Sequence, residues 1–269
     1  MSRKSRYDNQ KSKELLAAIV LVIIFIIAFY KYILIVLGTL VIAWLLYVTI
    51  KYWILKRNYQ KMQYYIDTQI PFKKIYRKKG KRFEIDCYEI LKTELKECKI
   101  LTNLIIPRLN AVNEFAEIDL IVFYNTGIYV LELKDYKGYV YGKKENYKWS
   151  VGYSVGSKKN NRETKVYEFQ NPIKQNEGHI SDLNRIKSYD YKNYVIFSKT
   201  MDFNSYIPNV LTIDKFIEII KSNKTLPQSD LIERESIYEL LRKYDLGNDD
   251  NIKNQHIMRQ QYNNKKYNN

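Results

Sequence analysis

Residues 117–134 decide the fold of this chain, and they read EIDLIVFYNTGIYVLELK. Two runs rich in β-branched and aromatic residues, 117–124 and 127–136, are separated by Asn125-Thr126, and Gly127 follows. Such a short polar break with glycine is typical of a β-hairpin turn. In the second run both alternating sets of positions are apolar, which is typical of a strand buried on both faces. The stretch therefore predicts two antiparallel strands, the second of them central in its sheet.

Charged residues end this second run. Glu132 and Lys134 point to the same side of the strand, and a charge in such a place costs free energy unless it is paired or bound to a metal ion. If a two-residue turn pairs Tyr124 with Gly127, Asp119 lies opposite Glu132 with Cβ atoms about 5 Å apart. A bulged three-residue turn would instead put Asp119 on the other side of the sheet, and the sequence leaves both registers open.

Two carboxylates this close repel each other unless a cation lies between them. A hard divalent ion such as Mg²⁺ suits a site made only of oxygen ligands. The metal would activate water and stabilise charge on a phosphate, while Lys134 would orient the nucleophile and offset the developing negative charge. The alternative interpretation is a plain salt bridge of Lys134 with Asp119 or Glu132 at a strand end, and the spacing does not distinguish the two.

Helix and strand patterns alternate around this hairpin. Apolar residues at helical spacing predict the first helix, and Asn171 followed by Pro172 is typical of a helix start. The expected elements are a helix at 83–95, strands at 100–106, 117–124 and 127–136, a short strand or hairpin at 138–149, a polar loop to about 162, a helix at 171–186, a strand at 194–197 and helices at 214–221 and 229–243. This order predicts an α/β domain with a mixed sheet.

From about Gly80 to Leu183 the chain resembles the nuclease-related domain called NERD, a branch of the PD-(D/E)-x-K restriction-endonuclease-like group. Phe83 departs from the glycine that usually precedes the first-helix glutamate in this family. The resemblance is carried by Glu84 on the first helix, Glu117-Ile118-Asp119, the run GIYVLELK at 127–134, Gly138, Trp149, and Asn171-Pro172-Ile173-Lys174-Gln175.

The resemblance implies a restriction-endonuclease-like mixed sheet flanked by helices and cleavage of phosphodiester bonds. We expect DNA rather than RNA as the substrate. It implies that Asp119 and Glu132 hold Mg²⁺ or Mn²⁺ and that Lys134 serves the attacking water. Glu84 and Gln175 would complete the site from the two helices. The alternative function is a catalytically inactive, membrane-tethered module that binds nucleic acid or another protein.

The N-terminal part is apolar enough to enter a membrane. Between Leu15 and Ile50 the only charged residue is Lys31. A single helix of this length would extend roughly 54 Å, whereas a hydrocarbon core of about 30 Å needs roughly 20 residues. We therefore expect a hairpin of two transmembrane helices, 15–30 and 33–50, with a turn at Lys31. One tilted span with the soluble part outside the cell is an alternative, and so is a signal peptide, although its apolar region would be only about 7–15 residues long.

Charge predicts the orientation of this segment. Five basic and two acidic residues precede Leu15, a net charge of +3, and nine basic residues and one acidic residue give +8 over 51–80. The positive-inside rule then places both flanks, and the rest of the chain, on the cytoplasmic side of the cell membrane. The predicted organisation is a basic N-terminus at 1–14, a transmembrane hairpin at 15–50, a basic linker at 51–79, a NERD-like domain at 80–200, a helical extension at 201–246 and a flexible polar tail at 247–269.

Composition narrows the possible chemistry. The chain has 269 residues, and 46% of them are hydrophobic, which excludes a wholly disordered protein. Its net charge of +16 suits a polyanionic partner. Cys87 and Cys98 are too few for a disulfide scaffold, and two histidines are too few for a histidine-rich metal site. Chemistry must then depend on carboxylates and lysines. His179 is expected at the surface or as a cap, and Cys87 and Trp149 in the core.

Overall fold

The computed structural model describes residues 3–76, 79–108, 114–136, 138–155, 163–198, 201–203, 206–249, 251–252, 254–255 and 258. Contacts within the chain define two compact units, Met1–Met62 and Gln63–Asn269. Each unit is considered by itself below.

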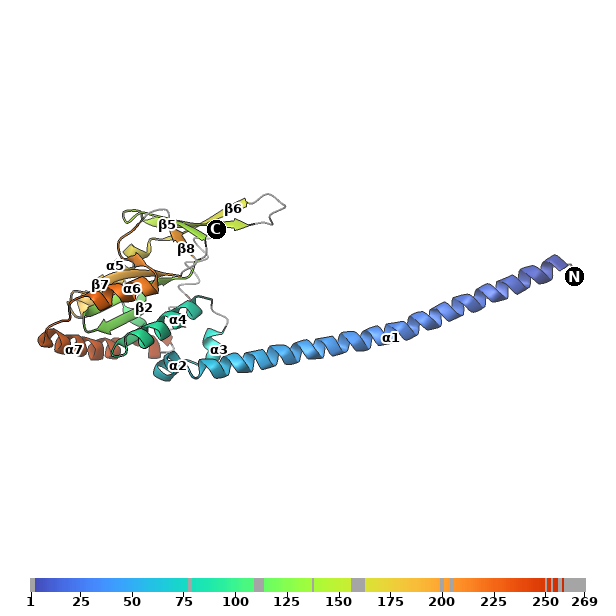
Figure 1. Cartoon of the computed structure of the whole chain (residues 1–269), viewed down its shortest axis with the longest axis horizontal. Coiled ribbons are helices and arrows are strands. Elements are labelled where there is room, and N and C mark those ends of the chain that lie inside the picture. Colours follow the sequence, from blue (N-terminus) through green and yellow to red (C-terminus); the bar gives the residue numbers. More distant parts are fainter. Residues whose placement is uncertain are drawn as a thin grey trace. The chain divides into compact units, whose positions relative to one another are not determined.

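The first unit is one helix, α1 (Arg3–Tyr59), and not the predicted hairpin at 15–50 (Figure 1). It continues through Lys31, because the sequence around that residue contains no glycine or proline that would end a helix. The turn had been inferred from the length of the apolar stretch alone. Side chains over 12–50 are exposed, and Ser12–Tyr59 is long and apolar enough to cross a membrane, as judged by length and composition.

The second unit is a mixed α/β structure with two sheets, and the first sheet is mixed, as predicted. In this sheet β1 pairs with β2 and β2 with β3 in antiparallel fashion, whereas β3 and β7, and β7 and β9, run parallel. Its strands, in spatial order, are β1 (Lys99–Pro107), β2 (Phe115–Tyr124), β3 (Gly127–Lys134), β7 (Lys192–Phe197) and β9 (Val210–Leu211).

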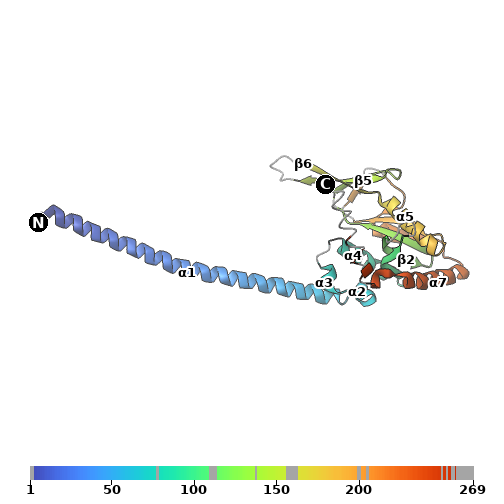
Figure 2. The same ribbon diagram turned by 180° about the vertical axis from the view of Figure 1, so that it is seen from behind.

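The strands of the second sheet are inserted between strands of the first: β4, β5 and β6 lie between β3 and β7 in the chain, and β8 lies between β7 and β9. Its strands, in spatial order, are β6 (Glu163–Gln170), β5 (Lys148–Val155), β4 (Gly138–Tyr141) and β8 (Met201–Phe203). Both views place β5 and β6 at the end of the unit opposite α7 (Figures 1 and 2). Trp149 and Val151 of β5 pack with Val195 and Phe197 of β7, so the two sheets share a core.

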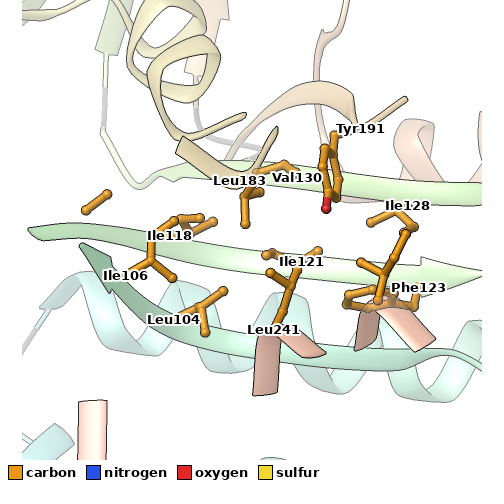
Figure 3. Close-up of a cluster of buried hydrophobic side chains, with 12 residues drawn as sticks. Leu104, Ile106, Ile118, Ile121, Phe123, Ile128, Val130, Leu183, Tyr191 and Leu241 are labelled. Carbon is orange, nitrogen blue, oxygen red and sulfur yellow. The ribbon is translucent and has the colours of Figure 1, made fainter. Parts of the chain in front are cut away.

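Helices cover both faces of the first sheet. The helices of this unit are α2 (Gln63–Thr68), α3 (Phe72–Ile75), α4 (Lys79–Glu94), α5 (Pro172–Ile186), α6 (Ile213–Ser222), α7 (Gln228–Tyr244) and the short 3₁₀ helix η1 (Leu246–Asn248). Leu183 of α5 and Leu241 of α7 join a core cluster with residues of β1, β2 and β3 (Figure 3). On the other face, the ring of Phe216 in α6 packs edge-on against the ring of Tyr129, with 5.5 Å between the ring centroids. On the same face, α4 contacts both α6 and β3.

In the middle of β1 and of β2 the regular alternation of inward-facing and outward-facing side chains is interrupted by one extra residue. The core cluster takes positions 101, 104 and 106 from β1 and 116, 118, 121 and 123 from β2. At the break in β1, Asn103 has a φ of 51°, a left-handed conformation that asparagine tolerates better than most residues. Asp119 lies opposite Asn103 in β2, because its neighbours Leu120 and Ile118 pair with Thr102 and Leu104.

Most of the predicted elements are present, with boundaries shifted by a few residues. The helix predicted at 171–186 is α5, which begins as expected because the Asn171 side chain accepts a hydrogen bond from the N–H of Ile173 at 3.0 Å. The strand predicted to end at Tyr136 ends at Lys134. Strands β6, β8 and β9 and helices α2 and α3 were not predicted, and the loop predicted after Trp149 is wrong as far as Val155, because β5 continues to that residue.

Candidate active site

The β2–β3 turn places the acidic residues of the two strands beside each other. Its two residues, Asn125 and Thr126, leave Tyr124 paired with Gly127, whose φ of 151° disfavours any side chain. The pairing continues to Leu120 and Leu131, and Asp119 and Glu132 are the next residues on their strands. The structure thus has the register of a two-residue turn.

Asp119 is held against the backbone next to Glu132. Its Oδ2 accepts a hydrogen bond of 2.8 Å from the N–H of Leu133. Burial raises the pKa of Asp119 well above its ordinary value, and the charges of Glu132 and Glu84 raise it further, against the opposing effect of Lys134. The negative charges of Glu132 and Glu84 therefore both act on the carboxyl group of Asp119.

Glu132, Lys134 and Gln175 form a directly bonded group. Glu132 is 2% exposed, and its Oε1 accepts a hydrogen bond of 2.6 Å from Nζ of Lys134. The same ammonium donates to Oε1 of Gln175, on α5, at 3.2 Å. The salt bridge of the alternative interpretation is thus present, and it lies within the predicted site.

The charges of this group shift both pKa values toward the ionised forms. For Glu132, burial alone would raise the pKa, but Lys134 and His179 outweigh burial and lower it. For Lys134, burial would lower the pKa, but Glu132 and Asp119 outweigh burial and raise it. The pKa values of Asp119 and Glu132 are thus displaced in opposite directions, a pattern that is common where two carboxylates have different roles.

Glu84 lies near this group but has a different partner. Its Oε2 is 2.6 Å from Nζ of Lys81, one turn earlier on α4. Lys81 also donates to Oδ1 of Asn103 and lies 3.8 Å from Oε1 of Glu117. Burial raises the pKa of Glu84, and Lys81 opposes this. Among the hydrogen bonds of the described residues, none joins Glu84 to Lys134 or Gln175.

His179 belongs to this site, although it was expected at the surface or as a cap. It is 3% exposed, and its Nε2 lies 3.5 Å from Oε2 of Glu132. A signal for this placement is present in the sequence, because His179 lies four residues before Leu183 and six after Ile173, on the inward face of α5. The expectation was wrong because a histidine in that stripe was treated as polar and therefore exposed.

The residues present fit a divalent ion bound by few protein ligands. In the described part of the chain, no group of three or more His, Cys, Asp and Glu side chains is arranged to hold a metal ion. Asp119 and Glu132 would then be the only two carboxylate ligands, which is common for Mg²⁺, since it keeps several waters and binds substrate phosphates. The mutual repulsion that raises the pKa of Asp119, and the buried Oε2 of Glu132 with no hydrogen-bond partner in the described structure, fit such a cation.

Other residues singled out in the sequence are structural or lie outside the site. Trp149 is buried, as expected, and its indole N–H donates to the carbonyl oxygen of Lys143 at 2.9 Å. Cys87 is buried in the core, which confirms its prediction. Tyr147, two residues before Trp149, is 72% exposed. The predicted polar loop also contains Lys158, Lys159 and Arg162, basic residues that could contact phosphates, and these fall outside the described residues.

Comparisons with known proteins agree with the predicted resemblance over part of the chain. Residues 79–198 match NERD, the nuclease-related domain family. An uncharacterized protein of Bacillus anthracis is 37% identical over 67 residues, which cover 25% of this chain and 27% of that protein. No solved structure matches the chain. All five predicted site residues, Glu84, Asp119, Glu132, Lys134 and Gln175, lie within the segment that is similar to a nuclease-related domain.

Proposed function

We propose that this chain is a membrane-anchored, metal-dependent nuclease of the PD-(D/E)-x-K type, with a restriction-endonuclease-like domain that hydrolyses DNA. The observation that carries the proposal is that Lys134 bonds both the buried Glu132 and Gln175 beside Asp119. The similarity of residues 79–198 to a nuclease-related domain supports a nucleic-acid substrate.

Asp119 and Glu132 would hold Mg²⁺ or Mn²⁺. When bound, the ion supplies Lewis-acid stabilisation of the phosphate and a more acidic water. Glu132 is suited to this role because its lowered pKa keeps it ionised. Asp119 is suited because its carboxylate forms no ion pair with a described residue, and because burial and the charges of Glu132 and Glu84 disfavour its negative charge, so that it would gain most from a divalent ion.

Lys134 acts as a cation and hydrogen-bond donor. Its raised pKa keeps the amine protonated, so it is unsuited to remove a proton from water. An ammonium has three N–H donors, and Glu132 and Gln175 accept two of them. The third can orient the attacking water or stabilise negative charge on the phosphate. Such stabilisation of transition-state charge typically contributes much to the rate when the site excludes water.

Helix α1 would anchor this domain to the membrane. With a single span, the two flanks lie on opposite sides of the bilayer, and the positive-inside rule must choose between them. The flank after the apolar stretch has the larger positive charge, +8 against +3. The charge difference therefore favours a cytoplasmic nuclease domain and an external N-terminus.

Cleavage by the full-length chain in detergent micelles tests the proposal. Supercoiled plasmid should be nicked or degraded with Mg²⁺ or Mn²⁺ and remain intact with EDTA. Glu132→Gln and Lys134→Met should each lower the rate by roughly 100- to 1,000-fold, the usual effect of removing one group that stabilises transition-state charge. Activity that needs no metal, or that survives both substitutions, would contradict the mechanism.

A second lysine–glutamate pair supplies a matched control. Lys148 and Glu168 form an exposed pair at 2.8 Å on the second sheet. Lys148→Met and Glu168→Gln remove the same chemical groups and should leave the cleavage rate within a few fold of the original. Salt-sensitive DNA binding without cleavage, unchanged by Glu132→Gln, would favour the non-catalytic module instead.

A further inference from the structure

A buried histidine of α5 faces the buried glutamate of β3, and the proposed mechanism does not use it. His179 and Glu132 are 3% and 2% exposed, and Nε2 of His179 lies 3.5 Å from Oε2 of Glu132. Within the described structure, neither imidazole nitrogen has a hydrogen-bond partner, and neither does Oε2 of Glu132. Buried polar atoms are normally hydrogen-bonded, so an imidazole and a carboxylate that face each other are natural partners.

The backbone around His179 is fixed to the sheet. One turn earlier on α5, the side-chain amide of Asn176 donates to the carbonyl oxygen of Val130 at 2.8 Å and to Oδ1 of Asn193 at 2.9 Å. These bonds join α5 to β3 and β7. The imidazole is therefore positioned beside Glu132 by the helix α5 and not by a loop.

Helix α5 meets both ends of the Glu132–Lys134 pair. Gln175 and His179 are four residues apart and thus lie on the same face of the helix. Gln175 accepts from the ammonium of Lys134, while His179 faces the carboxylate of Glu132. With Lys134 on Oε1 and His179 at Oε2, the carboxylate has a donor for each oxygen.

We propose that His179 is the positioning residue of Glu132: its Nε2–H donates to Oε2 and fixes the orientation of the carboxylate that holds the metal. The proposal rests on the proposed function, because the carboxylate it orients is the proposed metal ligand. A carboxylate has about four lone-pair sites, so donors from Lys134 and His179 leave room for a cation. Removing such a partner of a metal ligand typically costs 10- to 100-fold in metal affinity or activity.

Substitutions at position 179 in the full-length chain test the proposal. An amide nitrogen of glutamine reaches about as far as Nε2, whereas that of asparagine corresponds to Nδ1. His179→Ala and His179→Asn should weaken Mn²⁺ binding, measured by calorimetry, by roughly 10- to 100-fold, and should lower kcat more than they raise KM. His179→Gln should recover most of both losses. Loss of packing alone would not distinguish glutamine from asparagine in this way.

A packing control lies one turn further along the helix. Leu183 is fully buried in the core cluster with Ile118 and Val130. Leu183→Ala should lower the melting temperature, yet below that temperature it should keep Mn²⁺ affinity and kcat. The proposal is overturned if His179→Ala keeps the original Mn²⁺ affinity and kcat, or if Leu183→Ala loses them equally.

A spectroscopic readout separates this proposal from the proposed function. A hydrogen-bonded imidazole N–H gives a downfield proton resonance, and the chain has only two histidines, so His179→Ala assigns it. That resonance should move or vanish in Glu132→Ala. If it responds while the protein neither binds Mn²⁺ nor cleaves DNA, the histidine–carboxylate contact stands and the nuclease assignment fails. If it is absent, or is indifferent to Glu132→Ala, the positioning role is wrong whatever the activity.

Discussion

Asp119 combines a functional requirement with a cost in stability. Its pKa is raised by burial and by the charges of Glu132 and Glu84, so its ionised form is disfavoured in the folded protein. A carboxyl group with a raised pKa contributes stability at low pH and loses it as pH rises from the ordinary value of 3.8 through the raised one. Near neutral pH and without metal, the Asp119 charge should therefore oppose folding.

Asp119→Asn should stabilise the metal-free protein while abolishing cleavage. The amide oxygen can still accept from the N–H of Leu133, and the repelling charge is gone. We expect the free energy of unfolding to rise by about 1 kcal/mol near neutral pH, with the gain shrinking as pH falls toward 3.8. Urea unfolding in EDTA at two pH values measures this. Asp190→Asn, at an exposed surface pair, is the control and should change little. A less stable variant, or a gain independent of pH, would show that the charge is not the cause.

The strand residues of the site were predictable because local rules place them. A two-residue turn and the alternation of side chains predict Asp119 beside Glu132 and Lys134, although the sequence left the register of a bulged three-residue turn open as well. The inward position of His179 was missed although its spacing to Leu183 indicates it, but its contact with Glu132, 47 residues earlier, depends on the packing of α5 against β3 and is not visible in the sequence. Asn103 has a left-handed conformation where the alternation of inward-facing side chains in β1 is interrupted, and the residue pattern of β1 does not predict it.

At the scale of the elements, capping residues predicted structure better than strand propensity did. Asn171 marks the start of α5, and its amide also donates to the carbonyl oxygens of Lys143, Lys144 and Asn146, so it fixes the β4–β5 loop as well. The cap was visible in the sequence, whereas the loop contacts were not. Strand β6 reads ETKVYEFQ, and its described side chains are mostly exposed. Such an edge strand lacks the apolar run that marked β3.

Two glycines in and near these elements should respond to alanine in opposite directions. A Cβ at Gly178, inside α5, would meet no atom within 4 Å, whereas one at Gly142 would lie 2.4 Å from the ring of Trp149. Gly178→Ala should stabilise the protein by up to about 1 kcal/mol through helix propensity, and it should keep full activity although it neighbours His179. Gly142→Ala should destabilise by about 1–3 kcal/mol through overpacking. Chemical unfolding of both variants measures the pair, and a destabilising Gly178→Ala would mean that α5 is not a regular helix at that point.

At the scale of the whole molecule, the form of the N-terminal segment determines where the proposed nuclease acts. The hairpin prediction placed both flanks of the apolar stretch on one side of the membrane, and the single helix α1 places them on opposite sides if it spans. The orientation proposed from the charge difference of the flanks would then place the second unit in the cytoplasm. A nuclease domain on that side would meet intracellular nucleic acid, whereas one outside would meet only what leaves or approaches the cell.

Cysteine labelling in intact bacterial cells distinguishes the two arrangements. Single cysteines would be introduced by Ser5→Cys, before the apolar stretch, and by Ser229→Cys, at an exposed position near the start of α7. The native thiols give little background, since Cys87 and Cys98 are buried and burial raises the pKa of Cys98 to about 11, which keeps it a poorly reactive thiol at neutral pH. With a single span, a membrane-impermeant maleimide should label Ser5→Cys in intact cells and Ser229→Cys only after lysis. Protection of both until lysis would restore the hairpin, and labelling of Ser229→Cys in intact cells would place the nuclease domain outside.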